Sequence, residues 1–168
     1  MEKERINYYK GIIGELLVGY ILEGLPDDFK IIPGIEAAGG DIDHVLVGPT
    51  GIYTIDTKNW RGVVTDDGKG ELLWNGRSTA KREVHNLVRR TMFIKDKIKP
   101  LVPASNPFIH AVLVFPTART EIKKGETGKV DCIRADQLPS YVVKKRGKPL
   151  SKKEIASISQ ALESMPHE

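Results

Sequence analysis

The chain has 168 residues, of which 40% are hydrophobic, and this is enough to form one domain with a core. Lysine and arginine outnumber aspartate and glutamate by 26 to 22, which gives a net charge of +4 and a mildly basic chain. Cys132 is the only cysteine, so an intramolecular disulfide is excluded, and no apolar run is long enough to cross a bilayer.

These properties set the first expectations. Neither an internal repeat nor a low-complexity stretch suggests a second unit, so we expect a single domain over residues 1–168. The charged amino terminus lacks the apolar core of a signal peptide, and we therefore expect a cytoplasmic protein with no membrane partner. A basic excess is informative only once it is placed on a surface, where it favours a nucleic-acid partner.

The first predicted element is a helix from about Glu4 to Gly24. Apolar residues recur in it at spacings of three and four, which predicts that they face the core: Tyr9, Ile12, Ile13, Leu16, Leu17 and Tyr20. Glu15 stands beside this stripe. Gly11 and Gly14 lower helix propensity, so we expect a close approach there by the central sheet or by a substrate strand, with core packing as the alternative.

A short strand from Phe29 to Ile32, ended by Pro33-Gly34, precedes two β-rich runs, His44–Val47 and Ile52–Ile55. Gly48-Pro49-Thr50-Gly51 separates these runs and predicts a turn, so the segment reads as an antiparallel hairpin. Side-chain alternation then places Asp56 and Lys58 on one face and Thr57 on the other.

The register of this hairpin depends on its loop. A two-residue loop, Pro49-Thr50, places Asp43 directly opposite Asp56, whereas a three-residue loop with Gly51 as a bulge moves Asp43 to the other face. The turn chemistry favours the bulged loop, and the two-residue loop is the hypothesis we follow. Facing carboxylates repel unless a divalent hard cation neutralises them, which predicts Mg²⁺ or Mn²⁺. The alternative is that both aspartates are solvated strand ends and that Lys58 pairs with one of them.

Further elements follow in order. A second, shorter hairpin is predicted from Val63-Val64 and Glu71–Trp74, and a helix from Thr79 to Ile98. Trp60 is expected either to pack or, with Arg61, to stack on an unpaired base. The helix turns one stripe toward the core, comprising Val84, Leu87, Val88, Thr91, Ile94 and Ile98. Its other surface, including Lys81, Arg82, Arg89 and Arg90, is either a solvated face or a surface that binds a phosphate backbone.

The last third of the chain predicts a strand buried on both faces at Phe108–Phe115, a flexible basic loop at Thr117–Lys129 and a strand at Val130–Arg134. Ser151 and Glu154 form a capping box for a final helix that turns Ile155, Ile158 and Leu162 inward. The core elements therefore follow the order α-β-β-β-α-β.

Gly14-Glu15 in a helix, Asp43-His44 at a strand start, and Gly51 to Lys58 followed by Asn59 and Gly62 together resemble the nuclease-related domain, NERD. This family belongs to the PD-(D/E)xK nuclease superfamily. The resemblance covers about residues 8 to 75 with ordered motifs, and more loosely the chain to about residue 115. It implies an α/β fold with a restriction-endonuclease-like core: a central mixed β-sheet flanked by helices, here with a small extra hairpin and a carboxy-terminal helix.

The resemblance also implies a metal-dependent nuclease that hydrolyses phosphodiester bonds in DNA. Asp43, Asp56 and the carbonyl of Thr57 would ligate the metal, Lys58 would orient water or stabilise charge, and Glu15 would hold a water or a second metal. Asp56 stands where relatives commonly have glutamate, which shortens the reach of that ligand. The residues expected to bind nucleic acid are Arg61, Lys81, Arg82, Arg89 and Arg90.

Alternatives stay open at this point. One is a non-catalytic nucleic-acid-binding module that retains the nuclease fold, and a weaker one is a protein-interaction domain. RNA stays an alternative to DNA as the substrate. A homodimer is expected if both strands of a duplex are cut, because that needs two sites or one site that moves.

Overall fold

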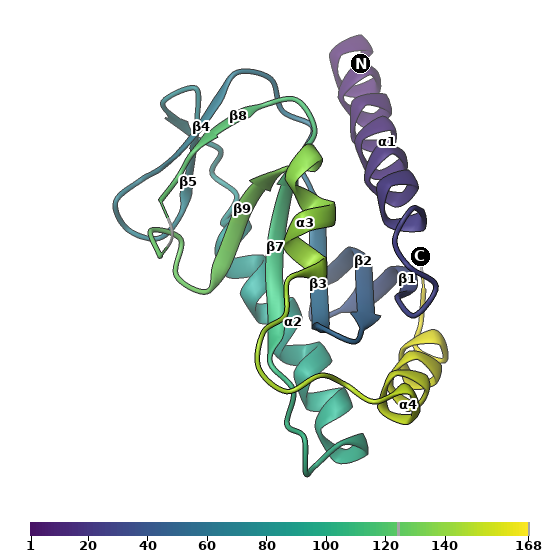
Figure 1. The fold of residues 1–168 in the computed structure, drawn as a ribbon. Helices are drawn as coiled ribbons and strands as arrows, with labels where there is room; N and C mark the ends of the chain where they lie inside the picture. Colours follow the sequence, from purple (N-terminus) through teal and green to yellow (C-terminus); the bar gives the residue numbers. More distant parts are fainter. Residues whose placement is uncertain (124, 168) are drawn as a thin grey trace.

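The computed structural model describes residues 1–123 and 125–167 and contains two β-sheets, the larger of which is covered by helices (Figure 1). The α-helices are α1 (Glu2–Glu23), α2 (Glu83–Ile98), α3 (Leu138–Val143) and α4 (Lys152–Glu163). The strands are β1 (Lys30–Ala37), β2 (Gly40–Gly48), β3 (Gly51–Thr57), β4 (Val63–Asp66), β5 (Leu72–Trp74), β6 (Arg77–Ser78), β7 (Ile109–Phe115), β8 (Arg119–Glu121) and β9 (Val130–Arg134). Two short 3₁₀ turns, Lys99–Leu101 and Ala135–Gln137, follow α2 and β9.

The central sheet has the strand order β1-β2-β3-β7-β9. The β1–β2 and β2–β3 pairs are antiparallel, whereas β7 runs parallel to both β3 and β9. The core therefore follows the predicted α-β-β-β-α-β order, and the predicted mixed sheet flanked by helices is confirmed. The strand predicted at Phe29–Ile32 begins one residue later and continues through Pro33-Gly34 to Ala37, because this stretch pairs with β2 along its length.

The β2–β3 hairpin adopts the two-residue loop, with Gly48 paired to Gly51 and His44 paired to Ile55. Gly51 has a φ of 141°, a conformation that side-chain-bearing residues rarely adopt. The loop is also held from outside, since the Thr50 hydroxyl donates to the Val142 carbonyl and Leu150 N–H donates to the Pro49 carbonyl. Contacts with the distant carboxy-terminal part of the chain thus accompany the register that places Asp43 opposite Asp56.

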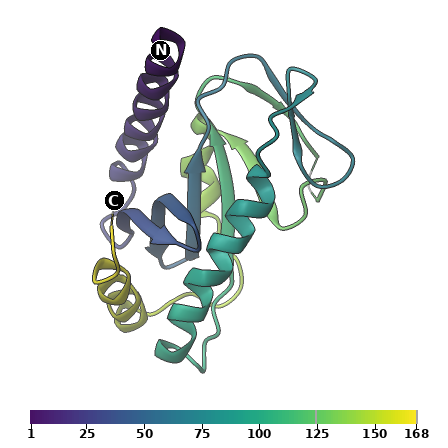
Figure 2. The same ribbon diagram turned by 180° about the vertical axis from the view of Figure 1, so that it is seen from behind.

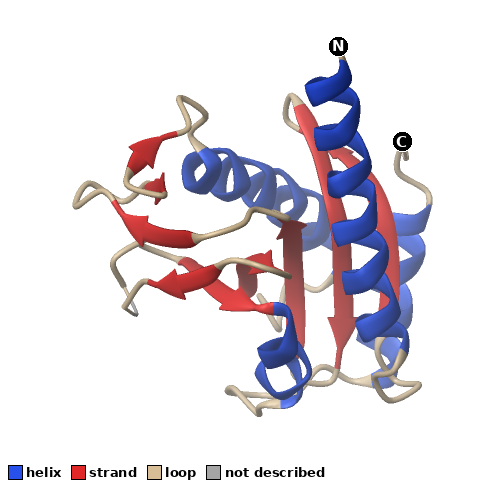
Figure 3. Ribbon diagram, turned by 90° about the horizontal axis from the view of Figure 1, so that it is seen from above, coloured by secondary structure: helices blue, strands red, loops and turns tan. Residues whose placement is uncertain are grey.

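Helices cover both faces of the central sheet, with α2 and α4 on one face and α1 and α3 on the other (Figures 2 and 3). The first layer packs Ile94 and Ile158 against alternate sheet residues such as Val45. The second packs Val18 and Leu138 against the other face of the sheet. Alternate side chains of β2 and β3 are therefore buried on opposite faces, as strand geometry requires.

The predicted second hairpin is present as β4 and β5, and it belongs to a separate sheet of order β6-β5-β4-β8. Strand β8 lies inside the segment predicted to be a flexible loop, so that prediction is wrong for Arg119–Glu121, which pairs in parallel with β4. Val64 and Leu72 anchor this small sheet to Val84 and Leu87 near the start of α2. That helix begins at Glu83 and not at Thr79 as predicted.

Helix α1 differs most from its prediction. The stripe expected to face the core is exposed, with Leu16 at 68% and Tyr20 at 76% exposure, and the buried residues are Gly14, Val18 and Leu22. The helix meets the sheet along this narrower line of smaller residues, and its amino-terminal end projects past the rest of the chain (Figures 1 and 2). None of the helices in the described residues is long and apolar enough to span a membrane.

The carboxy-terminal segment runs back along the outer edge of β1. Glu36 N–H donates to the Pro166 carbonyl at 3.0 Å, and His167 forms a β-bridge with Ile35. A ring nitrogen of His167 also lies 2.8 Å from the Pro33 carbonyl. Helix α4, with Ser151 and Glu154 in the predicted capping box, leads the chain to this edge.

Candidate active site

Two aspartates meet at the open end of the β2–β3 hairpin. Asp43 N–H donates to Asp56 Oδ1 at 3.0 Å, and Thr57 N–H donates to Asp43 Oδ2 at 2.8 Å. Each carboxylate is thus held through one oxygen by the backbone of the neighbouring strand, and the second oxygens, Asp43 Oδ1 and Asp56 Oδ2, take no part in these two hydrogen bonds. The register that the sequence left open has brought these two acids together.

Asp56 is buried and Asp43 is half-buried. Burial, with the nearby Asp56 charge as the second cause, raises the pKa of Asp43 to about 8. Burial also raises the pKa of Asp56, against the opposing effects of the Asp43 N–H bond and of the Lys58 and Arg90 charges. A pair of acids with raised pKa values is a common mark of a functional site, and it favours a cation between them.

Lys58 follows β3 directly and lies on the same side as Asp56. Its backbone N–H donates to the Val114 carbonyl of β7 at 2.9 Å, which fixes the position of the residue. Its Nζ lies 3.1 Å from Glu83 Oε2 at the start of α2, and the Glu83 side chain is only 7% exposed. The alternative in which Lys58 pairs with Asp43 or Asp56 is therefore not what the structure shows, because Lys58 forms its ion pair with an acid from another element.

Arg90 reaches the same place from α2. Its Nη1 lies 3.5 Å from Asp56 Oδ2 and donates to the Asp41 carbonyl at 3.3 Å. The guanidinium lies against Gly40, where an added Cβ would sit 2.1 Å from Arg90 Nη2, so a larger residue here would require the Arg90 side chain to shift. In this structure Arg90 neutralises a site carboxylate, and its predicted role as a phosphate contact stays a prediction.

The four residues predicted to be catalytic converge only in part. Asp56 and Lys58 line one cavity of about 400 Å³, together with Glu83 and Arg90. Glu15, on α1, lines a different pocket of about 480 Å³ with Asp43 and His44. Its negative charge adds to the raised pKa of Asp43, so Glu15 acts on the aspartate pair from the α1 side.

The donors present fit a hard divalent cation held at an open site. Mg²⁺ is commonly bound by one or two carboxylates, with water and substrate phosphate oxygens completing its shell. Asp43 and Asp56 supply two such carboxylates. In the described residues no cluster of three or more His, Cys, Asp or Glu side chains is arranged to hold a metal ion. Thr57 ends β3 beside these acids, and ligation by its carbonyl stays a prediction.

A groove carrying two stacked tryptophans adjoins the cavity. Trp60 and Trp74 lie with ring centroids 5.0 Å apart and nearly parallel, and Trp60 also contacts Phe115. This groove of about 680 Å³ is lined by Trp74, Arg77 and Lys81, and it shares Lys81 and Glu83 with the cavity at Asp56. Packing, the first alternative for Trp60, is what the structure shows, and it leaves Trp74 partly exposed.

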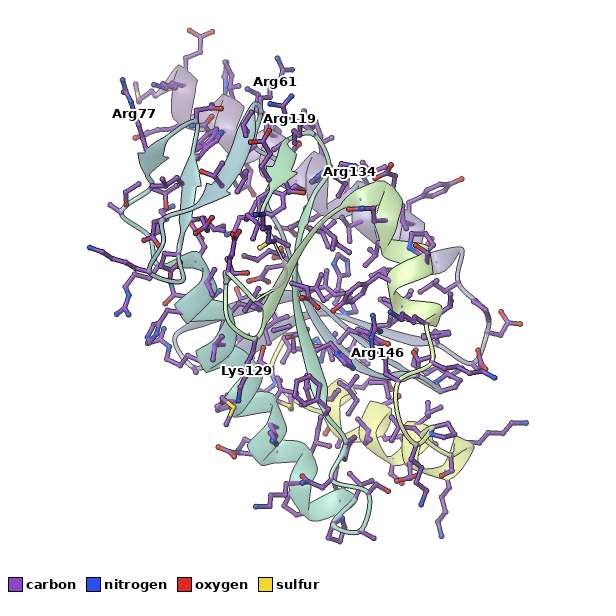
Figure 4. All side chains as sticks on the ribbon, turned by 60° about the vertical axis from the view of Figure 1, so that its left-hand side comes forward. Arg61, Arg77, Arg119, Lys129, Arg134 and Arg146 are labelled. Carbon is purple, nitrogen blue, oxygen red and sulfur yellow. The ribbon has the colours of Figure 1, made fainter. Side chains whose placement is uncertain are left out.

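Basic side chains gather around this groove. Arg61, Arg77 and Arg119 lie at the same end of the small sheet (Figure 4), where Arg119 pairs with Val63 and Arg77 pairs with Trp74. Of the residues predicted to bind nucleic acid, four are exposed: Arg61, Lys81, Arg82 and Arg89. Trp74 Nε1 donates to the Arg61 carbonyl at 2.7 Å, which ties the indole to the loop that carries Arg61.

Sequence reasoning missed Glu83 as a member of the site. An acid in the first turn of a helix is ordinary, because it interacts favourably with the helix dipole, and so carries no distinctive signal. Only the packing of α2 against β3 shows that Glu83 faces Lys58 and that Arg90 faces Asp56.

Comparison with known proteins supplies the family. The model described as nuclease-related domain, NERD, matches residues 10–116, a segment that contains Glu15, Asp43, Asp56 and Lys58. Comparison with curated proteins and with solved structures finds no match. The matched segment covers more than half of the chain and runs from α1 through β7. The chain therefore belongs to the NERD family, a branch of the restriction-endonuclease-like superfamily.

Proposed function

We propose that this protein is a metal-dependent nuclease that hydrolyses phosphodiester bonds in DNA, using Mg²⁺ or Mn²⁺. The observation that carries the proposal is the Asp43–Asp56 pair, one half-buried and one buried carboxylate held side by side across β2 and β3, with Lys58 two residues after Asp56. Membership of a nuclease-related family and the basic groove beside the pair support it.

The reaction adds water across a P–O bond and leaves a phosphate monoester and a free hydroxyl. Asp43 and Asp56 would hold the cation, which supplies positive charge at the phosphate and favours ionisation of the attacking water. Lys58 places a second positive charge beside the transferring phosphate, where preorganised charge counts most because the site is shielded from solvent. Glu83 holds the Lys58 ammonium group in place before substrate binds, and Arg90 does the same for the Asp56 carboxylate.

The groove next to this cavity offers a binding surface for the strand of the proposed substrate. Arg61, Arg77 and Lys81 can neutralise phosphates, and the exposed part of Trp74 offers a surface on which an unpaired base can stack. This combination supports DNA with a single-stranded portion near the cleaved bond.

The proposal is tested by incubating the protein with plasmid, linear duplex and single-stranded DNA in Mg²⁺, in Mn²⁺ and in chelator. We expect cleavage only with metal, and a loss of roughly 10²-fold or more in Asp56→Asn and Lys58→Met, because each removes charge directed at the transition state. Asp136→Asn and Lys153→Met serve as matched controls, since both residues are exposed and lie on the 3₁₀ turn Ala135–Gln137 and on α4, away from the pair. Metal-dependent cleavage that survives Asp56→Asn and Lys58→Met contradicts the proposal.

A second function, a nucleic-acid-binding module without catalysis, is favoured by one observation. The two positive groups nearest the aspartates, Lys58 and Arg90, are each already in an ion pair in this structure. Such a module predicts DNA binding that weakens steeply with salt and is insensitive to chelator and to Asp56→Asn. Binding of that kind without any cleavage would select this function over the enzymatic one.

A further inference from the structure

Helix α1 is apolar on two opposite sides. Its inner side, Gly14, Val18 and Leu22, is buried against the sheet. Its outer side presents large hydrophobic residues that are between 36 and 76% exposed: Ile6, Tyr8, Tyr9, Ile12, Ile13, Leu16, Leu17 and Tyr20. A helix that is hydrophobic around most of its circumference is normally buried on all sides, so the outer face of α1 lacks a covering surface within the described chain.

We call the outer residues from Ile6 to Tyr20, without Tyr8, the α1 stripe. At 100° per residue they fall within less than half a turn, and the only charged residues in this interval, Lys10 and Glu15, lie outside it. With roughly 200 Å² for each full side chain, the exposed parts of the α1 stripe amount to on the order of 750 Å². Isolated soluble proteins seldom expose so large an apolar patch, whereas one partner of a stable interface contributes about 800 Å².

The charges at the ends of the stripe indicate what covers it. Arg5 and Glu23 are 18 positions apart, about five turns, and so point in the same direction at opposite ends of the stripe. If two copies of α1 pack antiparallel about a two-fold axis, Arg5 of each copy faces Glu23 of the other, and the helix dipoles also oppose favourably. A parallel arrangement would bring like charges together.

A lipid surface fits less well. Helices that lie on membranes combine an apolar face with an excess of lysine and arginine. Helix α1 instead carries four acids, Glu2, Glu4, Glu15 and Glu23, against three basic residues, Lys3, Arg5 and Lys10.

We propose that two copies of this chain associate through an antiparallel pair of α1 helices, joined along the α1 stripe. Ile12 and Leu16 of the stripe also line the pocket that contains Glu15 and Asp43, so the interface borders this pocket in each copy. The proposal does not depend on catalysis, because it rests on the exposed face of α1 alone.

The test measures mass by sedimentation equilibrium between 1 and 100 µM protein. We expect a dimer, and we expect the double substitution Tyr9→Lys with Leu16→Lys to weaken the dissociation constant by about 100-fold or more. Both side chains are exposed in the single chain, so the circular dichroism spectrum should be unchanged. Phe108→Lys is the matched control, because Phe108 is 56% exposed and lies away from α1.

A charge exchange tests the orientation. Arg5→Glu should weaken the dimer by about 3- to 10-fold, since it places two acids together at both ends of the symmetric pair, and adding Glu23→Arg should restore it. A monomeric wild type at 100 µM overturns the proposal, as does a dimer that survives Tyr9→Lys with Leu16→Lys. Failure of the exchange to restore association overturns the antiparallel arrangement. Co-flotation of a monomeric wild type with phosphatidylcholine–phosphatidylserine vesicles, lost on the same double substitution, assigns the stripe to lipid instead.

Discussion

At the scale of single residues, the Asp43–Asp56 pair affects both the stability of the folded state and the proposed activity. The folded state places two acids where each resists ionisation, and the principal cause is their burial. Placing uncompensated negative charge in a buried site costs stability, and natural proteins retain such arrangements mainly where a ligand uses them. The pair is therefore expected to reveal itself in unfolding experiments as well as in activity.

The first prediction concerns Asp43→Asn in metal-free buffer. The folded pKa of about 8 lies above the ordinary value of 3.8, so the folded state retains a proton that the unfolded state loses. Asp43 therefore costs increasing stability as the pH rises from about 4 to about 8, and asparagine removes this cost. Relative to wild type, Asp43→Asn should gain about 1 kcal/mol or more between pH 5 and pH 8, or roughly 2–4 °C in Tm.

Differential scanning calorimetry at both pH values measures this gain, with exposed Asp136→Asn as the control. Saturating Mg²⁺ should raise the Tm of the wild type at pH 8 more than that of Asp43→Asn, because the ion binds the folded carboxylates. A Tm difference that stays constant with pH would contradict the assignment of a raised pKa to Asp43.

Residue identity alone could predict part of this site. Strand alternation placed Asp56 and Lys58 on one face, whereas the position of Asp43 depended on a hairpin register that the sequence left open and the structure shows to be the two-residue loop. Glu83 could not be found, because its contact with Lys58 joins α2 to the end of β3 across 25 positions of the chain. The role of Arg90 beside Asp56 depends in the same way on how α2 crosses the sheet.

At the scale of elements, two glycines on α1, Gly11 and Gly14, can be compared because they lie on the same helix in different surroundings. A Cβ at Gly14 would lie 2.8 Å from Asn59 Cβ and 3.3 Å from Thr57 Cγ2, whereas nothing lies within 4 Å of one at Gly11. The expected close approach to the sheet is therefore confirmed for Gly14, whereas the sheet does not approach Gly11, where approach by a substrate strand stays a prediction. Asn59 reinforces this contact, because its Nδ2 donates to the Lys10 carbonyl at 2.8 Å.

The second prediction follows from that difference. Gly14→Ala should destabilise the protein by about 1–3 kcal/mol, because α1 must move away from β3 to admit the methyl group. Gly11→Ala should stabilise it by about 0.5–1 kcal/mol, since alanine favours the helix and meets no neighbour. Urea denaturation of both variants measures the two changes, and equal effects at the two positions would show that α1 does not pack against Asn59 as described.

The small sheet supports a third prediction. Trp74 stacks on Trp60 with one face and borders the basic groove, so Trp74→Ala should remove a surface for base stacking. Affinity for single-stranded DNA should fall by about 1–3 kcal/mol, or roughly 5- to 150-fold, while affinity for duplex DNA changes less. Fluorescence anisotropy with matched single-stranded and duplex oligonucleotides measures both, and Met92→Ala, a change at an exposed position on α2, is the control. An equal loss for the two substrates would point to disruption of the small sheet and not to stacking.

At the scale of the whole molecule, the sequence predicted the elements that are buried in the usual way. Strand β7 was predicted to within one residue, and helix α2 was predicted with its correct end at Ile98, because their apolar side chains contact the core. The same rule failed for α1, where the larger apolar stripe faces outward and a smaller line of Gly14, Val18 and Leu22 faces the sheet. Apolar periodicity predicts that a helix face will be buried. It does not predict whether the surface that buries it belongs to the same chain.

The carboxy-terminal segment along β1 determines which fragments of this protein keep a protected sheet edge. Edge strands with unpaired backbone groups recruit other strands and cause aggregation. Here the Pro166 carbonyl and His167 cap part of β1 at one edge, while β9 covers β7 on the other side of the sheet. A fragment trimmed to the family-matched residues 10–116 would lose both the carboxy-terminal segment and β9. The region that defines the family would then expose β1 and β7 as unprotected edge strands.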